Sequence, residues 1–305
     1  MLYPDPIVHD KGWFGMKSFS IIGCGAVGKT VGRLFYDTGI LEPRDILTRS
    51  LQSASRAAEF IGAGRPLAVW QDLRQADLYL VAASDDAIAA CAGALAESGV
   101  VEPGAVVCHL SGALSSAALE PVARLGAAVA SVHPVKSFAH PELCINDFAG
   151  TWCGIEGDPA AVEFLSGAFR AIGGEIFALD PRFKTIYHAG SVLVCNYLTA
   201  LIEAGARAYE KGGVPREQAF QVMEPLVRET LENVFRSGTV QALTGPIARG
   251  DAAVVSAQLE ALKAWDGEMA ELYRALAGVA LDLSRRRGQA SEAGLAAVAR
   301  LLDKE

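Results

Sequence analysis

The sequence has no uninterrupted apolar run of the ~18 residues that a helix needs to cross a bilayer. Of its 305 residues 51% are hydrophobic, but alanine supplies much of that share, so the composition is not that of a membrane protein. The first 16 residues, MLYPDPIVHDKGWFGM, combine acids and two prolines with no apolar core, unlike a secretory signal. We expect residues 1–16 to be an N-terminal extension, with Met16 as a candidate start.

Basic clusters and paired cysteines are also scarce. The only arginine cluster, SRRRG at 284–288, suits the end of a helix, and the net charge is −8, so we expect no nucleic-acid partner. The six cysteines form no CxxC motif and lie in separate predicted elements. That pattern is typical of reduced thiols and not of a clustered zinc site. We expect a cytoplasmic protein with no metal and no membrane partner.

Strand and helix patterns alternate through the first half of the chain. Apolar strands that alternate with helices predict a doubly wound, parallel Rossmann sheet with helices on both faces. The predicted strands are 17–23, 44–50, 76–84, 104–112, 126–134, 150–157 and 174–180, and the predicted helices between them are 26–39, 53–62 and 85–99.

The strand pattern stops near residue 180, and an all-α region follows. One long helix is predicted over 183–213, with Asp180 as its N-cap and Pro181 at its first position. Further helices are predicted over 215–236, 251–263, 265–284 and 290–303. We therefore expect two domains: a dinucleotide-binding domain over 17–180, and a helical domain for substrate binding and dimerisation over 181–305.

The stretch IIGCGAVGKTVG contains a phosphate-binding glycine pattern. Gly23, Gly25 and Gly28 have the spacing GxGxxG, directly after the first strand. Gly23 permits the tight turn, Gly25 lets the backbone approach a pyrophosphate, and Gly28 lets helix and strand pack closely. Ala26 and Val27 begin the helix, whose N-terminus offers unpaired N–H groups.

The second strand ends in ILTRS, where an NAD enzyme usually places an acidic residue. Here Thr48, Arg49 and Ser50 occupy that position. The planar guanidinium of Arg49 can hold a 2′-phosphate, and Ser50 can donate to it. The alternative is a solvated surface arginine, but its place at the strand end favours NADP.

The ends of the later strands should lie at the same edge of the sheet. Ala83 and Ser84 are expected on the nicotinamide side, followed by two aspartates that suit helix capping. Ser111 and His133 each follow a strand and are candidate catalytic residues. His109, inside its strand, is expected to be structural.

The long helix carries a polar stripe that begins at His188 and includes Asn196. His188 is a candidate general acid, because imidazole ionises near working pH. Asn196 lies ~12 Å further along the axis, so it would hold another part of a substrate or cofactor. Hydrogen bonding between helices is the alternative for both.

The loop LTGPIARGD, residues 243–251, separates two predicted helices. Arg249 is a candidate for binding a substrate carboxylate, with Thr244 beside it, and Asp251 suits an N-cap. A structural loop with a surface arginine is the alternative.

The motifs GCGAVG, TRS, VAASDDAI, HLSGA, SVHPVKSF, YHAGSVLVCNY and LTGPIARGD, in this order, resemble a bacterial family of Rossmann-like proteins with a C-terminal domain of unknown function. The resemblance covers nearly all of residues 17–281. It implies the architecture of the phosphogluconate dehydrogenase superfamily, which includes ketopantoate reductases, hydroxyacid dehydrogenases and prephenate dehydrogenases. These enzymes act on small carboxylic acids with NAD(P), usually as homodimers built through the helical domain.

Ketopantoate and hydroxyacid enzymes place a lysine, and an asparagine four residues later, on the first long helix. This chain departs from that pattern: His188 stands at the lysine position, Val192 at the asparagine position, and Asn196 one turn further on. The sequence therefore predicts an NADP-dependent reductase of a small 2-oxo or imino carboxylic acid, with a ketopantoate-like substrate as one candidate. The alternative is a protein that binds NADP without turnover, as a sensor or regulatory partner.

Overall fold

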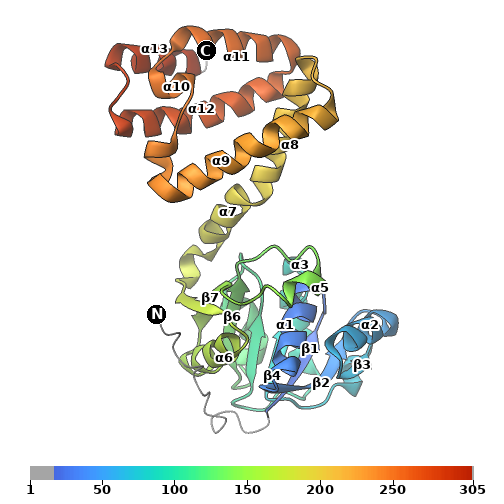
Figure 1. Cartoon of the computed structure of the whole chain (residues 1–305). Helices are drawn as coiled ribbons and strands as arrows, with labels where there is room; N and C mark the ends of the chain where they lie inside the picture. Colours follow the sequence, from blue (N-terminus) through green and yellow to red (C-terminus); the bar gives the residue numbers. More distant parts are fainter. Residues whose placement is uncertain (1–16, 304–305) are drawn as a thin grey trace, which may run out of the picture. The chain divides into compact units, whose positions relative to one another are not determined.

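A computed structural model describes residues 17–303 of the chain. The predicted extension, residues 1–16, and the last two residues lie outside the described residues. The chain divides into two compact units, Met1–Cys195 and Asn196–Glu305, and each is described by itself. The first contains the sheet, and the second is helical (Figure 1).

The first unit is built on an eight-stranded sheet in the order β3-β2-β1-β4-β5-β6-β7-β8. The sequence crosses from β3 back to β4 on the other side of β1, which is the doubly wound topology that the alternating pattern predicts. The strands are β1 Lys17–Ile22, β2 Leu41–Leu47, β3 Arg65–Leu67, β4 Leu78–Val81, β5 Val106–His109, β6 Ala128–Pro134, β7 Trp152–Gly157 and β8 Glu175–Ala178.

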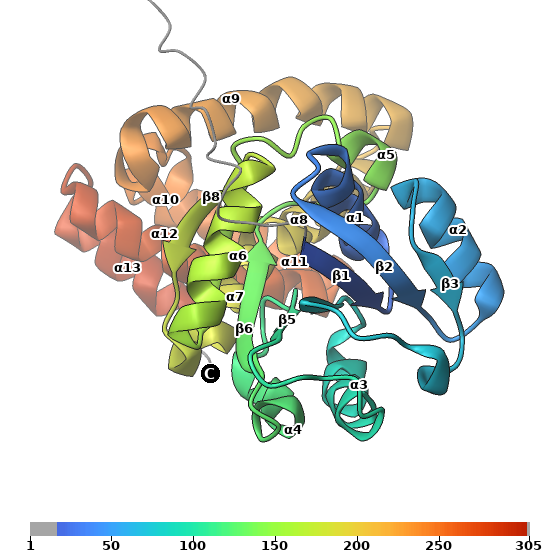
Figure 2. The ribbon, with the colours of Figure 1, turned by 90° about the horizontal axis from the view of Figure 1, so that it is seen from below.

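Helices cover both faces of this sheet (Figure 2). One face packs against α1, α2 and α6 and the other against α3 and α4, and each face has its own core of buried side chains. The α-helices of this unit are α1 Ala26–Asp37, α2 Leu51–Ile61, α3 Asp85–Glu97, α4 Glu120–Ala123, α5 Pro141–Cys144, α6 Pro159–Ala171 and α7 Lys184–Val194. The short 3-10 turns are η1 Trp70–Asp72, η2 Ser116–Leu119 and η3 Pro181–Phe183.

The two cores follow from the alternation of side chains along buried strands. Leu78 and Leu80 of β4 belong to the core under α1 and α6, whereas Tyr79 and Val81 belong to the core under α3. Tyr79 is fully buried, and its hydroxyl donates to the carbonyl of Val100 at 2.8 Å. A strand with both faces covered is apolar throughout, which explains the unbroken LYLV run.

Two features of the sheet differ from the sequence-based expectation. β7 runs antiparallel to β6, with Ser131 opposite Glu156, although β8 is again parallel to β7. A parallel neighbour requires a full crossover, and the connection between these strands contains only the four-residue α5, so the chain turns back. The three-residue β3 was not expected, because it is too short to show an apolar pattern.

The helix predicted over 183–213 is interrupted at Cys195, which has φ −113° and ψ −66°. The segment before it is α7, and α8 spans Asn196–Lys211. The division into units falls at this interruption and not after residue 180, where the pattern changes from strands to helices. The physical reason is Lys184, whose buried side chain donates to the hydroxyl of Ser131 on β6 and pairs with Glu156 on β7, which holds α7 in the first unit.

The second unit consists of helices in the part of the chain that the structure describes. They are α8, α9 Arg216–Ala242, α10 Pro246–Arg249, α11 Ala252–Trp265, α12 Gly267–Arg287 and α13 Glu292–Leu302. α9 is broken at Gly238, which has φ 77° and ψ 160°, close to the predicted helix end at 236. The predicted N-cap of α11 is confirmed, since the Asp251 side chain accepts from the backbone N–H of Val254.

One described stretch, Pro181–Lys211, is long and apolar enough to cross a membrane by length and composition alone. Only 6% of its most apolar part is buried. A helix whose apolar side chains are covered by another protein surface meets the same criterion, so the finding is weak evidence for a membrane. The exposed large side chains in the stretch are Phe183, Ile186, Leu193, Val194, Tyr197 and Leu201.

We propose that a second copy of this chain covers these side chains, so that the protein is a homodimer through residues 181–305. Light scattering at micromolar concentration should give the mass of a dimer. Val194 is 74% exposed, and Val194→Glu should weaken the dimer by more than roughly tenfold, because association would bury a charge.

The matched control is Val69→Glu, at a valine of the first unit that is 49% exposed and lies outside residues 181–305. It should leave the dimer intact. A wild-type monomer would contradict the proposal, as would wild-type protein that sediments with membranes and dissolves only in detergent.

Candidate functional site

The glycine turn after β1 has the geometry of a phosphate cradle. Gly23 has φ +70°, and a β-carbon there would lie 2.9 Å from the Cα of Ala83. A β-carbon at Gly28 would lie 2.7 Å from that of Ala82, so α1 packs directly on the residue that follows β4. Gly25, the N-cap of α1, has open space where its β-carbon would be. These are the three roles that a dinucleotide cradle requires of its glycines, and the turn therefore fits NAD(P).

The first turn of α1, which begins with Ala26 and Val27, contains no acidic residue. The positive end of the helix dipole is therefore not neutralised by the helix's own side chains, which favours an anion beside it. Gly23 itself is held by a hydrogen bond from its N–H to the carbonyl of Leu47 on β2, at 2.8 Å.

The predicted adenosine side lies at the end of β2. Ser50 is the N-cap of α2, where its hydroxyl accepts from the N–H of Ser53 at 3.2 Å. Thr48 donates to the carbonyl of Ser50 at 2.8 Å. Both side chains thus shape the turn, and Arg49 between them is exposed. Among the described residues we find no ion pair of Arg49, so its guanidinium is available to a phosphate.

The end of β4 lies next to the glycine turn, as β4 pairs with β1. Ala83 packs against Gly23, and Ser84 is the N-cap of α3. The two aspartates expected to cap this helix, Asp85 and Asp86, lie in the first turn of α3, one and two residues after the N-cap. Both cofactor residues predicted here therefore lie beside the cradle.

The loop after β5 is held by side chains. His109 is fully buried: its Nδ1 accepts from the N–H of Ser111 at 3.2 Å, so its Nε2 carries the proton and donates to the carbonyl of Ser115 at 3.0 Å. Burial, chiefly, lowers the pKa of His109 to about 4, which keeps the ring neutral. The structural role expected for His109 is confirmed.

Ser111 has a structural task that its position at the strand end did not reveal. Its hydroxyl oxygen accepts from the N–H groups of Ala113 and Leu114, at 3.1 and 3.0 Å. The side chain is buried and forms the turn of the loop. Ser111 therefore shapes the candidate site from below, and its catalytic role stays a prediction.

A buried ion pair fixes the same loop from the other side. The Lys184 side chain of α7 is 1% exposed, and its Nζ donates to the carbonyl of Ser111 at 3.0 Å and to the hydroxyl of Ser131. Nζ lies 3.6 Å from Oε1 of Glu156, which is 3% exposed. Glu156 in turn accepts from the N–H and the hydroxyl of Ser116, at 2.8 and 2.7 Å. Burial lowers the pKa of Lys184 to about 8.

Above this loop two histidines from different elements converge. A β-carbon at Gly112 would lie 2.4 Å from Nδ1 of His188 and 2.7 Å from Nε2 of His133. Both nitrogens therefore face the same point, and their rings are edge to face with centroids 5.4 Å apart. Nδ1 of His188 is buried and has no hydrogen-bond partner among the described residues. A buried polar atom of this kind indicates a place for a ligand atom.

His133 is backed by Tyr187, whose hydroxyl lies 2.9 Å from its Nδ1. Burial lowers the pKa of His133 to about 4, helped by the positive charges of His188 and Lys184. His133 therefore stays neutral at pH 7. The two histidines, each predicted separately as a catalytic candidate, thus lie together at the carboxyl edge of the sheet.

Four residues of the site were not predicted from the sequence: Gly112, Glu156, Lys184 and Tyr187. Lys184 lies one helical turn before His188 and so continues the polar stripe toward the N-terminus, which is a signal that could have been used. Glu156 is a single acid in an otherwise apolar strand, a pattern that indicates a buried partner. Nothing in the sequence pairs these residues across the fold.

The remaining predicted site residues belong to the second unit. Asn196 begins α8, Thr244 precedes α10, and Arg249 ends α10. All three are exposed. Their roles toward substrate or cofactor stay predictions.

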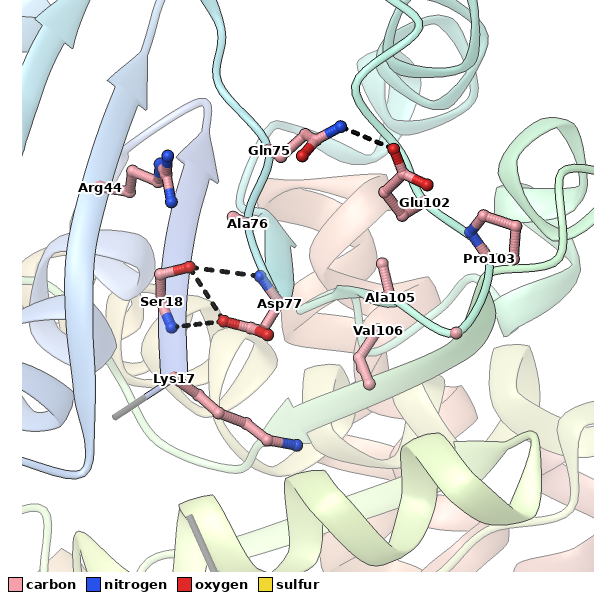
Figure 3. Close-up of a pocket in the computed structure, with 11 residues that line it drawn as sticks. Lys17, Ser18, Arg44, Gln75, Ala76, Asp77, Glu102, Pro103, Ala105 and Val106 are labelled. Atoms are coloured by element: carbon pink, nitrogen blue, oxygen red, sulfur yellow. Dashed lines mark hydrogen bonds between the residues drawn. The ribbon is translucent and has the colours of Figure 1, made fainter. Parts of the chain in front are cut away.

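A surface hollow of about 410 Å³ lies at the opposite, amino-terminal edge of the sheet, next to the starts of β1, β4 and β5 (Figure 3). Four of its polar residues pair with one another: Asp77 accepts from the N–H and hydroxyl of Ser18, and Gln75 donates to Glu102 at 2.6 Å. Ligands of doubly wound sheets bind at the carboxyl edge, so this hollow is not the candidate site.

Family models match both halves of the chain. A Rossmann-like domain model matches residues 15–134, and a model of a domain of unknown function, DUF2520, matches residues 151–279. The chain is a Rossmann-like protein with a DUF2520 domain. The family resemblance of its motifs is thereby confirmed. A comparison of this sequence with curated proteins finds no match.

Solved structures share the fold of this DUF2520 protein. TM1727 from Thermotoga maritima is 24% identical, with a TM-score of 0.69 over 89% of this chain and 100% of that one. An NADH-preferring ketol-acid reductoisomerase from an uncultured archaeon is 16% identical, with a TM-score of 0.61 over 96% of each chain. Plasmodium falciparum pyrroline carboxylate reductase, solved with NADP bound, is 13% identical, with a TM-score of 0.54 over 93% and 100%.

The convergence on Gly112 can be tested without any ligand. Gly112→Ala should push the His133 and His188 rings apart and cost about 1–3 kcal/mol of the free energy of unfolding, as overpacking does. NMR of the histidine rings should show both signals shifted, and denaturant unfolding measures the stability.

The control is Gly93→Ala on α3, where no atom beyond the adjacent residues and backbone of α3 itself lies within 4 Å of the new β-carbon. That change should raise stability by roughly 0.5–1 kcal/mol and leave the rings unchanged. Gly112→Ala protein with wild-type stability and wild-type histidine signals would refute the convergence.

Proposed function

We propose that this protein is an NADP-dependent oxidoreductase that reduces a small 2-oxo or imino carboxylic acid. The observation that carries the proposal is the convergence of His133 and His188 on one point above Gly112, along the sheet edge that holds the glycine cradle. The protein also shares its fold with several oxidoreductases, which supports an oxidoreductase function. A ketopantoate-like substrate is one candidate within this class.

The chemistry divides between cofactor and chain. Bound NADPH would supply a hydride to the carbon of a C=O or C=N bond and become NADP⁺, while the released electron pair goes to the oxygen or nitrogen. The chain must then hold that atom and give it one proton. His188 suits this task, because Nδ1 has no hydrogen-bond partner in the part of the chain that the structure describes, and imidazole can carry a proton near neutral pH.

His133 has a different part in the proposal. Because it stays neutral, it cannot deliver a proton as an imidazolium, but it can hydrogen-bond the reacting atom. The loop beneath is fixed by His109, Glu156 and Lys184, so neither ring needs to reorganise around a moving backbone.

The first prediction from this proposal concerns the cofactor. Arg49 should favour NADP over NAD through a charge-assisted contact with the 2′-phosphate, worth about 1.5–3 kcal/mol or roughly ten- to a hundredfold in affinity. Calorimetric titration of wild-type protein with both nucleotides measures the preference, and Arg49→Gln should remove it.

The control is Arg56→Gln, at an exposed arginine on α2. This variant should keep the preference for NADP over NAD. Equal affinity of the wild-type protein for NADP and NAD, or tighter binding of NAD, would reject this reading of the TRS motif.

The second prediction concerns His188. His188→Ala protein should fold and bind NADPH normally, whereas reduction should slow by about 10²–10⁴-fold, as expected for the loss of one acid–base group. The wild-type rate should fall as the pH rises, because the donor must carry the proton that it gives to the substrate. Stopped-flow oxidation of NADPH against pH measures both effects.

His140→Ala, at an exposed histidine before α5, should change neither rate nor pH profile. A folded His188→Ala protein with wild-type turnover would remove His188 from the mechanism. If no oxo or imino acid in a broad screen oxidises NADPH although NADPH binds, the protein is instead a sensor or regulatory partner.

A further inference from the structure

Tyr187 and His133 form a hydrogen bond whose direction decides what His133 can offer a substrate. Nδ1 of His133 lies 2.9 Å from the Tyr187 hydroxyl, and their rings are edge to face at 84°. A neutral imidazole carries one N–H, on either Nδ1 or Nε2. If Tyr187 donates to Nδ1, the proton of His133 must be on Nε2, which faces the point above Gly112.

The phenol is the better donor of the two groups. Burial raises the pKa of Tyr187 to about 12, so its hydroxyl keeps its proton at every working pH. A phenol is nonetheless a stronger acid than a neutral imidazole N–H, and the unprotonated imidazole nitrogen is a stronger acceptor than a phenol oxygen. The bond therefore runs from the Tyr187 hydroxyl to Nδ1 of His133, which leaves Nε2 as a donor.

We propose that Tyr187 is a positioning residue that holds His133 as an Nε2–H donor, and that this donor and protonated His188 together bind one carbonyl oxygen, so that the site selects 2-oxo acids over imines. The inference rests on the proposed function. It narrows the substrate class that the function left open.

Two donors at one point suit oxygen for a simple reason. A carbonyl oxygen has two lone pairs and can accept from both rings at once. A neutral imine nitrogen has one lone pair, and a protonated imine has none and would direct its own N–H at the donors. Each mismatch leaves a buried donor without an acceptor, which is the strongest form of discrimination that a polar site has.

The charged groups around the two rings largely balance one another. Lys184, on the same helix as His188 and Tyr187, donates from its ammonium to the carbonyl of Ser111, directly before Gly112. The carboxylate of Glu156 lies 3.6 Å from that ammonium, and Asp85 at the start of α3 also offsets the positive charge at His133. The choice between oxygen and nitrogen therefore depends on the two hydrogen-bond donors and not on the net charge around them.

The first test reads the tautomer directly and needs no substrate. Proton–nitrogen NMR correlation of protein labelled at histidine should show a protonated Nε2 and an unprotonated Nδ1 in His133, identified by the loss of its signals in His133→Asn protein. Tyr187→Phe should populate the Nδ1–H form, whereas Tyr36→Phe, at a tyrosine of α1 whose ring lies against Gly62, should not. A wild-type His133 with its proton on Nδ1 overturns the inference and leaves the proposed function standing.

The second test compares 2-oxobutanoate with 1-pyrroline-2-carboxylate, two acids of similar size, as substrates with NADPH. We expect the oxo acid to have a kcat/KM at least roughly tenfold higher. Tyr187→Phe should lower kcat for the oxo acid by about 10–10²-fold while the Kd of NADPH is unchanged, and Tyr36→Phe should match wild type.

Faster reduction of the imine overturns the inference alone, because the protein would still be a reductase. Equal kcat for wild-type and folded Tyr187→Phe protein also overturns it. Absence of NADPH oxidation across the whole screen of acids defeats the proposed function instead, and the NMR result then separates the two failures.

Discussion

The buried ammonium of Lys184 is the contact on which the candidate site depends. An unpaired charge at 1% exposure would be strongly destabilising, so the chain must surround it with acceptors: the carbonyl of Ser111, the hydroxyl of Ser131 and the carboxylate of Glu156. These groups come from the loop after β5, from β6 and from β7. Removing one member of such a pair typically costs about 3–5 kcal/mol, because the other charge stays buried. One side chain of α7 therefore ties the helix, two strands and the loop into a single geometry.

That geometry determines where the histidines point. His188 lies one turn after Lys184 on α7, so the bond that anchors the helix also sets the height of the imidazole above Gly112. His133 comes from β6, two residues after Ser131, which is the register partner of Glu156 on β7. Both catalytic candidates thus stand on elements of regular structure, next to the residues of the ion pair. Sites built in this way keep their donors aligned without reorganisation.

Much of the architecture could be predicted from the sequence, because it depends on local patterns. The GxGxxG turn, the alternation of strands and helices and the cap at Asp251 are each visible within a dozen residues. The antiparallel course of β7 was not predictable, since strand direction depends on how the connection crosses the sheet. The interruption at Cys195 was also invisible, because the residues on both sides of it favour helix. Above all, Lys184 and Glu156 are brought together only by the tertiary fold. Their positions in the sequence give no sign that they form an ion pair.

The same hydrogen bonds have a consequence for motion. Loops at the edge of a sheet usually exchange their amide hydrogens with solvent rapidly, since nothing but water holds them. Here the N–H groups of Ser111, Ala113, Leu114 and Ser116 each donate to a side chain, and those side chains are anchored in β5, the loop itself and β7. Exchange then requires that the polar network open as a unit. We therefore expect the amide hydrogens of this loop to exchange as slowly as those of the sheet. The loop would then be one of the last parts of the first unit to open.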